Sequence, residues 1–171
     1  AFGDASAQAG GSATEPASES GGEYASPEFG HTIAWNAPWS LSQPQSWPEP
    51  GQNFVTLVSG DANLALRATS GVGSPQQFIE FYASSTQARE NAEVVTSTDD
   101  PGFGRAVARF TVDGASYIEY VEVRALPDNG LFLTILLAPE SGFSQAHQAA
   151  QQLVTVDQQP PFRAAPSLPG G

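Results

Sequence analysis

The chain contains no cysteine, no methionine and no lysine among its 171 residues. Without cysteine, neither a disulfide framework nor a thiolate metal site can form. All six basic residues are arginines scattered along the chain, and 18 acidic residues bring the formal net charge to −12. Because such a surface repels phosphate groups, we expect no nucleic-acid partner.

Long apolar runs are also missing. No stretch approaches the roughly 20 apolar residues that cross a bilayer as a helix, so the sequence predicts no membrane-spanning segment. Residues 1–28 contain no leucine, isoleucine or valine and are rich in Gly, Ser, Ala and Glu. Such a segment has little to bury, and we expect a flexible arm. A chain that starts at Ala1 in such an arm fits a processed, exported protein, located outside the cell or at its surface.

The other end of the chain is rich in proline. Residues 158–171 contain four prolines, which favour an extended conformation and block helix and ladder hydrogen bonds. We expect a C-terminal tail that is disordered alone or ordered by a partner. The domain that remains is 29–157. The apolar residues with which the arm and the tail could dock on a partner are Phe2, Tyr24, Phe162 and Leu168.

Strand and turn signals alternate along the predicted domain. Asp113-Gly114 is a pair favoured in two-residue hairpin turns, and the chain on both sides of it alternates between polar and apolar residues. We expect strands at 31–35, 54–58, 63–69, 93–97, 105–112, 116–126 and 131–137.

Two helices are also expected. Ser74-Pro75 followed by Gln77 is a helix start, with a serine N-cap, proline at the first helical position and a glutamine that completes a capping box. This helix should reach about residue 89, and a second should occupy 139–153. The predicted fold class is α+β, with an antiparallel sheet of about six strands packed against two helices.

The order of these elements, together with Ile33-Ala34-Trp35-Asn36-Ala37-Pro38-Trp39, resembles the PsbP-like family of photosystem II extrinsic proteins and bacterial secreted proteins. The resemblance covers about residues 29–157. It implies an antiparallel sheet packed against helices and an exported accessory protein without enzymatic activity or cofactor. The chain lacks the lipobox cysteine of the lipoprotein members, and the Pro-rich tail is not part of the family pattern.

The residues that could carry catalysis are few. His31 and His147 are the two histidines, and no Gly-x-Ser-x-Gly motif surrounds any serine. We interpret both histidines as ordinary surface residues. Glu119 and Glu122 have odd spacing on one predicted strand, so they should point to opposite faces and not act as a pair. The sequence therefore predicts neither an enzyme nor a metal site.

Three tryptophans are the candidate contact residues. Trp35 and Trp39 favour packing as lids over the core, whereas Trp47 lies between prolines in a polar loop. For Trp47, a contact site and packing against the sheet edge remain equally open. Three functions follow, in order of preference: an exported module that binds proteins, a structural subunit of an extracellular assembly or filament whose tails dock on neighbouring subunits, and a hydrolase.

Overall fold

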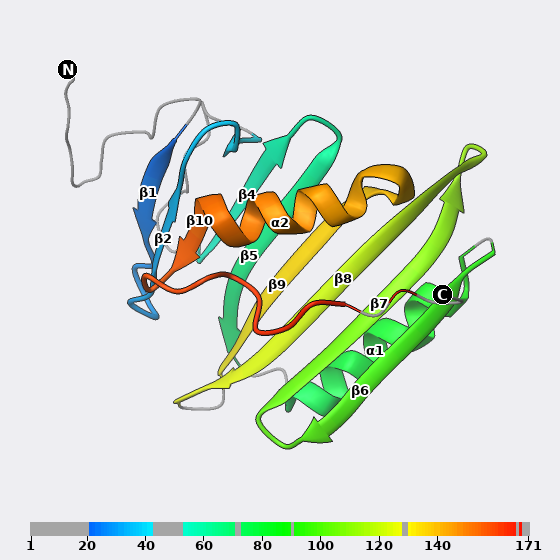
Figure 1. The fold of residues 1–171 in the computed structure, drawn as a ribbon. Coiled ribbons are helices and arrows are strands. Elements are labelled where there is room, and N and C mark those ends of the chain that lie inside the picture. Colours follow the sequence, from blue (N-terminus) through cyan, green and yellow to red (C-terminus); the bar gives the residue numbers. More distant parts are fainter. Residues whose placement is uncertain are drawn as a thin grey trace.

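A computed structural model describes residues 21–42, 53–70, 73–89, 91–127, 130–166 and 168. The fold is α+β, with two antiparallel sheets and two helices (Figure 1). The larger sheet has seven strands in the order β3-β4-β5-β9-β8-β7-β6, and the smaller has three in the order β1-β2-β10.

The strands of the larger sheet are β3 (Ser40–Leu41), β4 (Phe54–Ser59), β5 (Ala62–Ser70), β6 (Glu93–Asp100), β7 (Phe103–Val112), β8 (Ala115–Leu126) and β9 (Gly130–Pro139). The smaller sheet consists of β1 (Gly22–Ala25), β2 (Thr32–Trp35) and β10 (Val154–Val156). The helices are α1 (Pro75–Gln87) and α2 (Phe143–Leu153), and a short 3-10 turn precedes α2.

The two faces of the larger sheet carry different layers. Helix α1 packs on β6, β7 and β8, with Ile79 inserted among Ala106, Val121 and Val123. The opposite face carries α2 and the smaller sheet (Figure 1), and the main core lies between them. Strand β9 is largely buried on both faces, which explains its near-continuous apolar sequence.

Local signals account for several of these elements. Ser74 caps α1, and its hydroxyl accepts from the Gln77 N–H while the Gln77 side chain accepts from the Ser74 N–H, as the sequence predicts. Asp113 and Gly114 both have positive φ, at 51° and 82°, in the turn between β7 and β8. Helix α1 comes so close to β7 that a Cβ on Gly104 would lie 2.8 Å from Ile79 Cγ1.

Both ends of the domain differ from the sequence expectation. Strand β1 lies inside the segment 1–28 that we assigned to a flexible arm, and it pairs with β2 from Gly22↔Trp35 to Ala25↔Thr32. The boundary at residue 28 is therefore wrong for the part of the arm that the structure describes. Strand β10, which the sequence did not predict, completes the smaller sheet on the other side of β2.

Candidate functional site

The C-terminal tail lies across the face of its own sheet. After β10 the chain reverses direction and runs beside α2 over β9 and β8 towards β7 (Figure 1). We name the surface beneath it the tail groove, which is formed by Phe103, Tyr120, Glu122, His147 and Gln151. The described part of the tail is therefore ordered by its own domain.

Phe162 occupies an aromatic pocket in the tail groove. Its side chain is 3% exposed, and its ring centroid lies 5.1 Å from that of Tyr120 and 5.2 Å from that of His147. The His147 ring in turn stacks on Phe143 at 6.4 Å. Residues of β8 and α2 thus enclose one side chain of the tail.

The backbone of Phe162 is held by the side-chain amide of Gln151 on α2. The Phe162 N–H donates to Gln151 Oε1 at 2.9 Å, and Gln151 Nε2 donates to the Phe162 carbonyl at 3.0 Å. In a β-sheet, the backbone of a neighbouring strand forms the same two hydrogen bonds that the Gln151 amide forms here. Gln151 therefore binds the backbone of Phe162 and not its side chain.

The carboxylate of Glu122 holds the next two residues. Its oxygens accept the backbone N–H groups of Arg163 at 2.7 Å and Ala164 at 3.0 Å, and the Tyr120 hydroxyl donates to it at 2.5 Å. Glu122 is 5% exposed. Burial raises the pKa of this carboxyl, and the hydrogen bonds from Arg163, Tyr120 and Ala164 oppose that rise.

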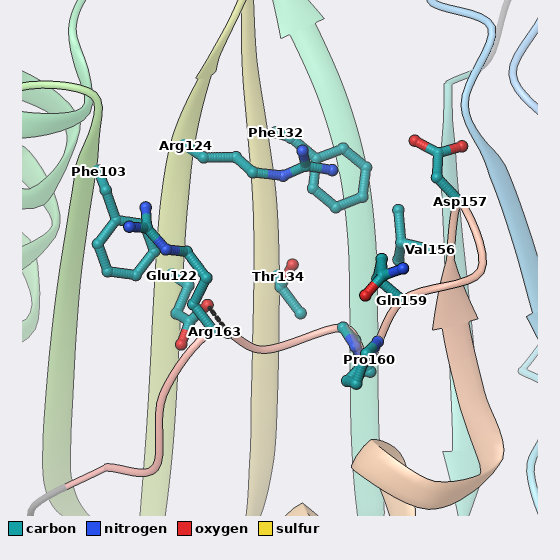
Figure 2. A pocket seen from close by; sticks show the side chains of 11 residues that line it. Phe103, Glu122, Arg124, Phe132, Thr134, Val156, Asp157, Gln159, Pro160 and Arg163 are labelled. Carbon is teal, nitrogen blue, oxygen red and sulfur yellow. Dashed lines mark hydrogen bonds between the residues drawn. The ribbon is translucent and has the colours of Figure 1, made fainter.

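Arg163 extends from the tail to the outer strands. Its guanidinium lies 4.1 Å from the Phe103 ring centroid and 3.4 Å from Asp100 Oδ2. A cavity of about 210 Å³ remains between the tail and the sheet. Figure 2 shows Glu122 with its hydrogen bond to Arg163 on one side of this cavity and Arg124 lying across the Phe132 ring on the other, at 4.7 Å from the ring centroid.

A tight turn leads from β10 into the tail. Val156 and Gln159 exchange backbone hydrogen bonds at 2.8 and 3.0 Å, and the two residues between them, Asp157 and Gln158, have φ values of 51° and 68°. Asp157 Oδ1 accepts the Thr32 N–H at 2.9 Å. Two consecutive non-glycine residues in the left-handed region carry backbone strain.

The structure separates the candidate contact residues. Trp35 and Trp39 are 2% and 0% exposed, so they belong to the core and are not accessible to a partner. Trp47 lies outside the described residues.

The four residues expected to dock on a partner also lie in different surroundings. Phe2 lies outside the described residues. Tyr24 is 7% exposed in β1, Phe162 is buried in the tail groove, and Leu168 packs against the core. All three described residues thus contact the protein's own domain.

The interpretation of the histidines as surface residues is wrong for His31, whereas His147 is partly exposed. His31 is 6% exposed and packs edge-on against Phe132 at 4.9 Å. Neither of its ring nitrogens has a hydrogen-bond partner among the described residues, and the same holds for Nε2 of His147. Burial lowers the pKa of both imidazoles. The predicted separation of the two glutamates is confirmed, since Glu119 accepts from Tyr82 of α1 at 2.6 Å on the face opposite Glu122.

Sequence reasoning missed Glu122 and Gln151. The alternation along β8 predicts that Tyr120 and Glu122 share a face, but it does not say that a buried carboxylate lies there. Within the part of the chain that the structure describes, no group of three His, Asp or Glu side chains could hold a metal ion. In the same part, no helix is both long enough and apolar enough to cross a membrane.

Solved structures include proteins of the same architecture. The Ran-binding protein Mog1p from Saccharomyces cerevisiae matches 77% of this chain and 85% of its own, with a TM-score of 0.50 and 10% sequence identity. The chain shares its fold with Mog1p. LpqN of Mycobacterium tuberculosis, described as involved in cell envelope biogenesis, matches 80% of this chain and 91% of its own with a TM-score of 0.49 and 13% identity. No family model matches the chain, and a search of curated proteins found no match.

Proposed function

We propose that this chain is an exported, non-enzymatic accessory protein that binds a short segment of another protein in the tail groove. The observation that carries the proposal is the way in which the groove holds the C-terminal tail. Glu122 and Gln151 bind four backbone groups of three consecutive residues, and a single aromatic side chain fills a pocket between them.

This combination is typical of peptide recognition. Hydrogen bonds to the main chain provide affinity for any extended segment, and a pocket for one side chain provides selectivity. The groups that bind the backbone are carried by β8 and α2, so they are positioned before a segment arrives. The C-terminal tail then represents a bound segment, and Pro160 and Pro161 before Phe162 restrict its backbone.

Other features support a binding role rather than catalysis. Both imidazoles pack against aromatic rings, His31 against Phe132 and His147 against Tyr120, Phe143 and Phe162, and His31 is buried. The fold is compatible with protein binding, since Mog1p is a Ran-binding protein. A location outside the cell or at its surface is part of the proposal, and it rests on the composition of the acidic, Gly- and Ser-rich arm.

The test is binding of a separate peptide. A Phe162→Ala chain keeps the groove but weakens its own tail, so a fluorescent peptide of residues 158–168 should bind to it, as measured by anisotropy. A peptide with alanine in place of Phe162 is the matched control and should bind at least about tenfold more weakly, because it leaves the aromatic pocket empty. Circular dichroism confirms that the variant is folded, and no binding to a folded variant would contradict the proposal.

A second candidate function is that of a structural subunit in an extracellular assembly. It is favoured by the observation that Phe162, one of the apolar anchors expected in the tail, does insert into a groove. Every copy of the chain presents the same groove. A tail that leaves its own domain therefore has a matching site on each neighbour.

A further inference from the structure

The turn between β10 and the tail is the strained part of this arrangement. Asp157 and Gln158 both adopt left-handed backbone conformations, which residues with a Cβ adopt at a cost. The turn exists because the tail folds back onto the domain from which it came. If the tail continued away from β10 instead, both residues could take ordinary extended conformations.

We propose that the C-terminal tail exchanges between two copies of the chain, so that the tail of each copy occupies the tail groove of the other. This proposal rests on the proposed function of the groove, and it names a second copy of the chain as the partner. The turn from Val156 to Gln159 is the hinge. A reciprocal exchange gives a closed dimer in which both copies make the same contacts.

The partner follows from the contacts already present. A tail from a second copy brings the same Phe162 to the same aromatic pocket and the same backbone N–H groups to Glu122. Exchange therefore conserves the hydrogen bonds and the burial of the tail beyond the hinge. It breaks the two Val156–Gln159 backbone hydrogen bonds and releases the backbone strain at the hinge. Short hinges under strain favour exchange for this reason. Exchange is opposed by the higher effective concentration of each tail near the groove of its own chain.

Substitutions of Gln158 can either stabilise or destabilise the closed turn at the hinge. In Gln158→Gly, the left-handed conformation carries no Cβ penalty, so the closed turn becomes more stable relative to the exchanged dimer. The dissociation constant of the dimer should therefore rise about fivefold or more. In Gln158→Pro, the ring fixes φ near about −65°, which excludes the observed value of 68° and should favour the exchanged dimer. Gln158 is exposed, so neither change affects the core.

Light scattering after size-exclusion chromatography, over a concentration series of the full chain, measures the outcome. We expect the dimer fraction to rise from Gln158→Gly through the unchanged chain to Gln158→Pro. The double variant Gln158→Pro with Phe162→Ala should be monomeric, because the tail has lost its anchor. A folded Gln158→Pro chain that stays monomeric at all concentrations overturns the proposal, as does a dimer that persists in the double variant.

Mixed copies test the exchange itself. A Phe162→Ala copy has an intact groove and a defective tail, whereas a Glu122→Gln copy has a defective groove and an intact tail. When both copies also carry Gln158→Pro and are mixed, the intact tail can enter the intact groove, so we expect heterodimers. Absence of heterodimers between folded copies contradicts exchange. If the peptide binds the Phe162→Ala chain but Gln158→Pro forms no dimers, exchange is overturned and the proposed function stands. Loss of peptide binding overturns both.

Discussion

Glu122 on β8 accepts the backbone N–H of Arg163 at 2.7 Å, although the two residues are 41 positions apart in the sequence. The bond places a buried carboxylate under a segment that the sequence alone describes as a flexible tail. A buried carboxylate without such donors would be costly, so the groove and the segment it holds depend on each other.

The first prediction concerns this carboxylate. Glu122→Gln keeps the shape of the side chain but replaces one acceptor oxygen with an NH2 group that faces a hydrogen-bond donor, so the free energy of unfolding should fall by about 1 to 3 kcal/mol. Denaturant titration measures the change. The matched control is Glu80→Gln, at an exposed position on α1, which should change stability by less than about 0.5 kcal/mol. Equal effects of the two substitutions would contradict the role of Glu122.

The aromatic anchor gives a second prediction. Phe162→Ala empties a pocket between Tyr120 and His147, and the free energy of unfolding should fall by about 3 kcal/mol. Phe81→Ala serves as the control because Phe81 is 69% exposed, and its loss should be nearly neutral. Thermal unfolding followed by circular dichroism compares them. If both variants melt at the same temperature, the tail does not contribute to the fold as described.

The third prediction concerns pH. Burial lowers the pKa of His147 in the folded chain from its usual value near 6.5, so the unfolded chain takes up a proton first as the pH falls. The stability associated with neutral His147 is therefore present above about pH 6.5 and is lost as the pH drops below it. His31 acts in the same direction, whereas the raised pKa of Glu122 adds stability as the pH falls.

A variant isolates the contribution of His147. His147→Leu should lose less stability than the unchanged chain between pH 7 and pH 5, as measured by urea unfolding at each pH. The other titrating groups are present in both proteins, so the difference between them reports on His147. An identical loss in the two proteins would show that His147 does not titrate differently on folding.

A fourth prediction tests the packing of α1 on the sheet. Gly104→Ala introduces a Cβ only 2.8 Å from Ile79 Cγ1, and overpacking of this kind should lower stability by about 1 to 3 kcal/mol. At Gly102, by contrast, a Cβ would have its nearest neighbour at 3.9 Å. Gly102→Ala should therefore stay within about 0.5 kcal/mol of the unchanged chain in the same denaturant titration. A tolerated Gly104→Ala would mean that α1 packs less closely than described.

Features encoded by neighbouring residues could be predicted from the sequence. The capping box at Ser74, the Asp113-Gly114 turn and the strands expected at 54–58 and 63–69 all depend on short-range patterns, and each is confirmed. The fold class follows from the same patterns.

The candidate site could not be predicted in this way because its contacts are distant in the sequence. Asp157 binds Thr32 across 125 positions in the sequence. Gln151 on α2 binds the Phe162 backbone, although the helix pattern does not distinguish it from an ordinary polar surface residue. The proline-rich composition predicts an extended segment, whereas the chain bends at Pro161, Arg163 and Ala164, and the composition carries no information about the surface on which the segment lies.

The central claim is that the C-terminal tail occupies a groove from which another peptide segment can displace it. Hydrogen exchange at the Phe162, Arg163 and Ala164 amides of the full chain tests this claim most directly, measured with and without a millimolar excess of a peptide of residues 158–168, enough to compete with the attached tail. We predict that the peptide speeds exchange at these three amides while those of β8 stay protected. If the three amides remain equally protected at every peptide concentration, the tail is a fixed part of the fold and the claim is wrong.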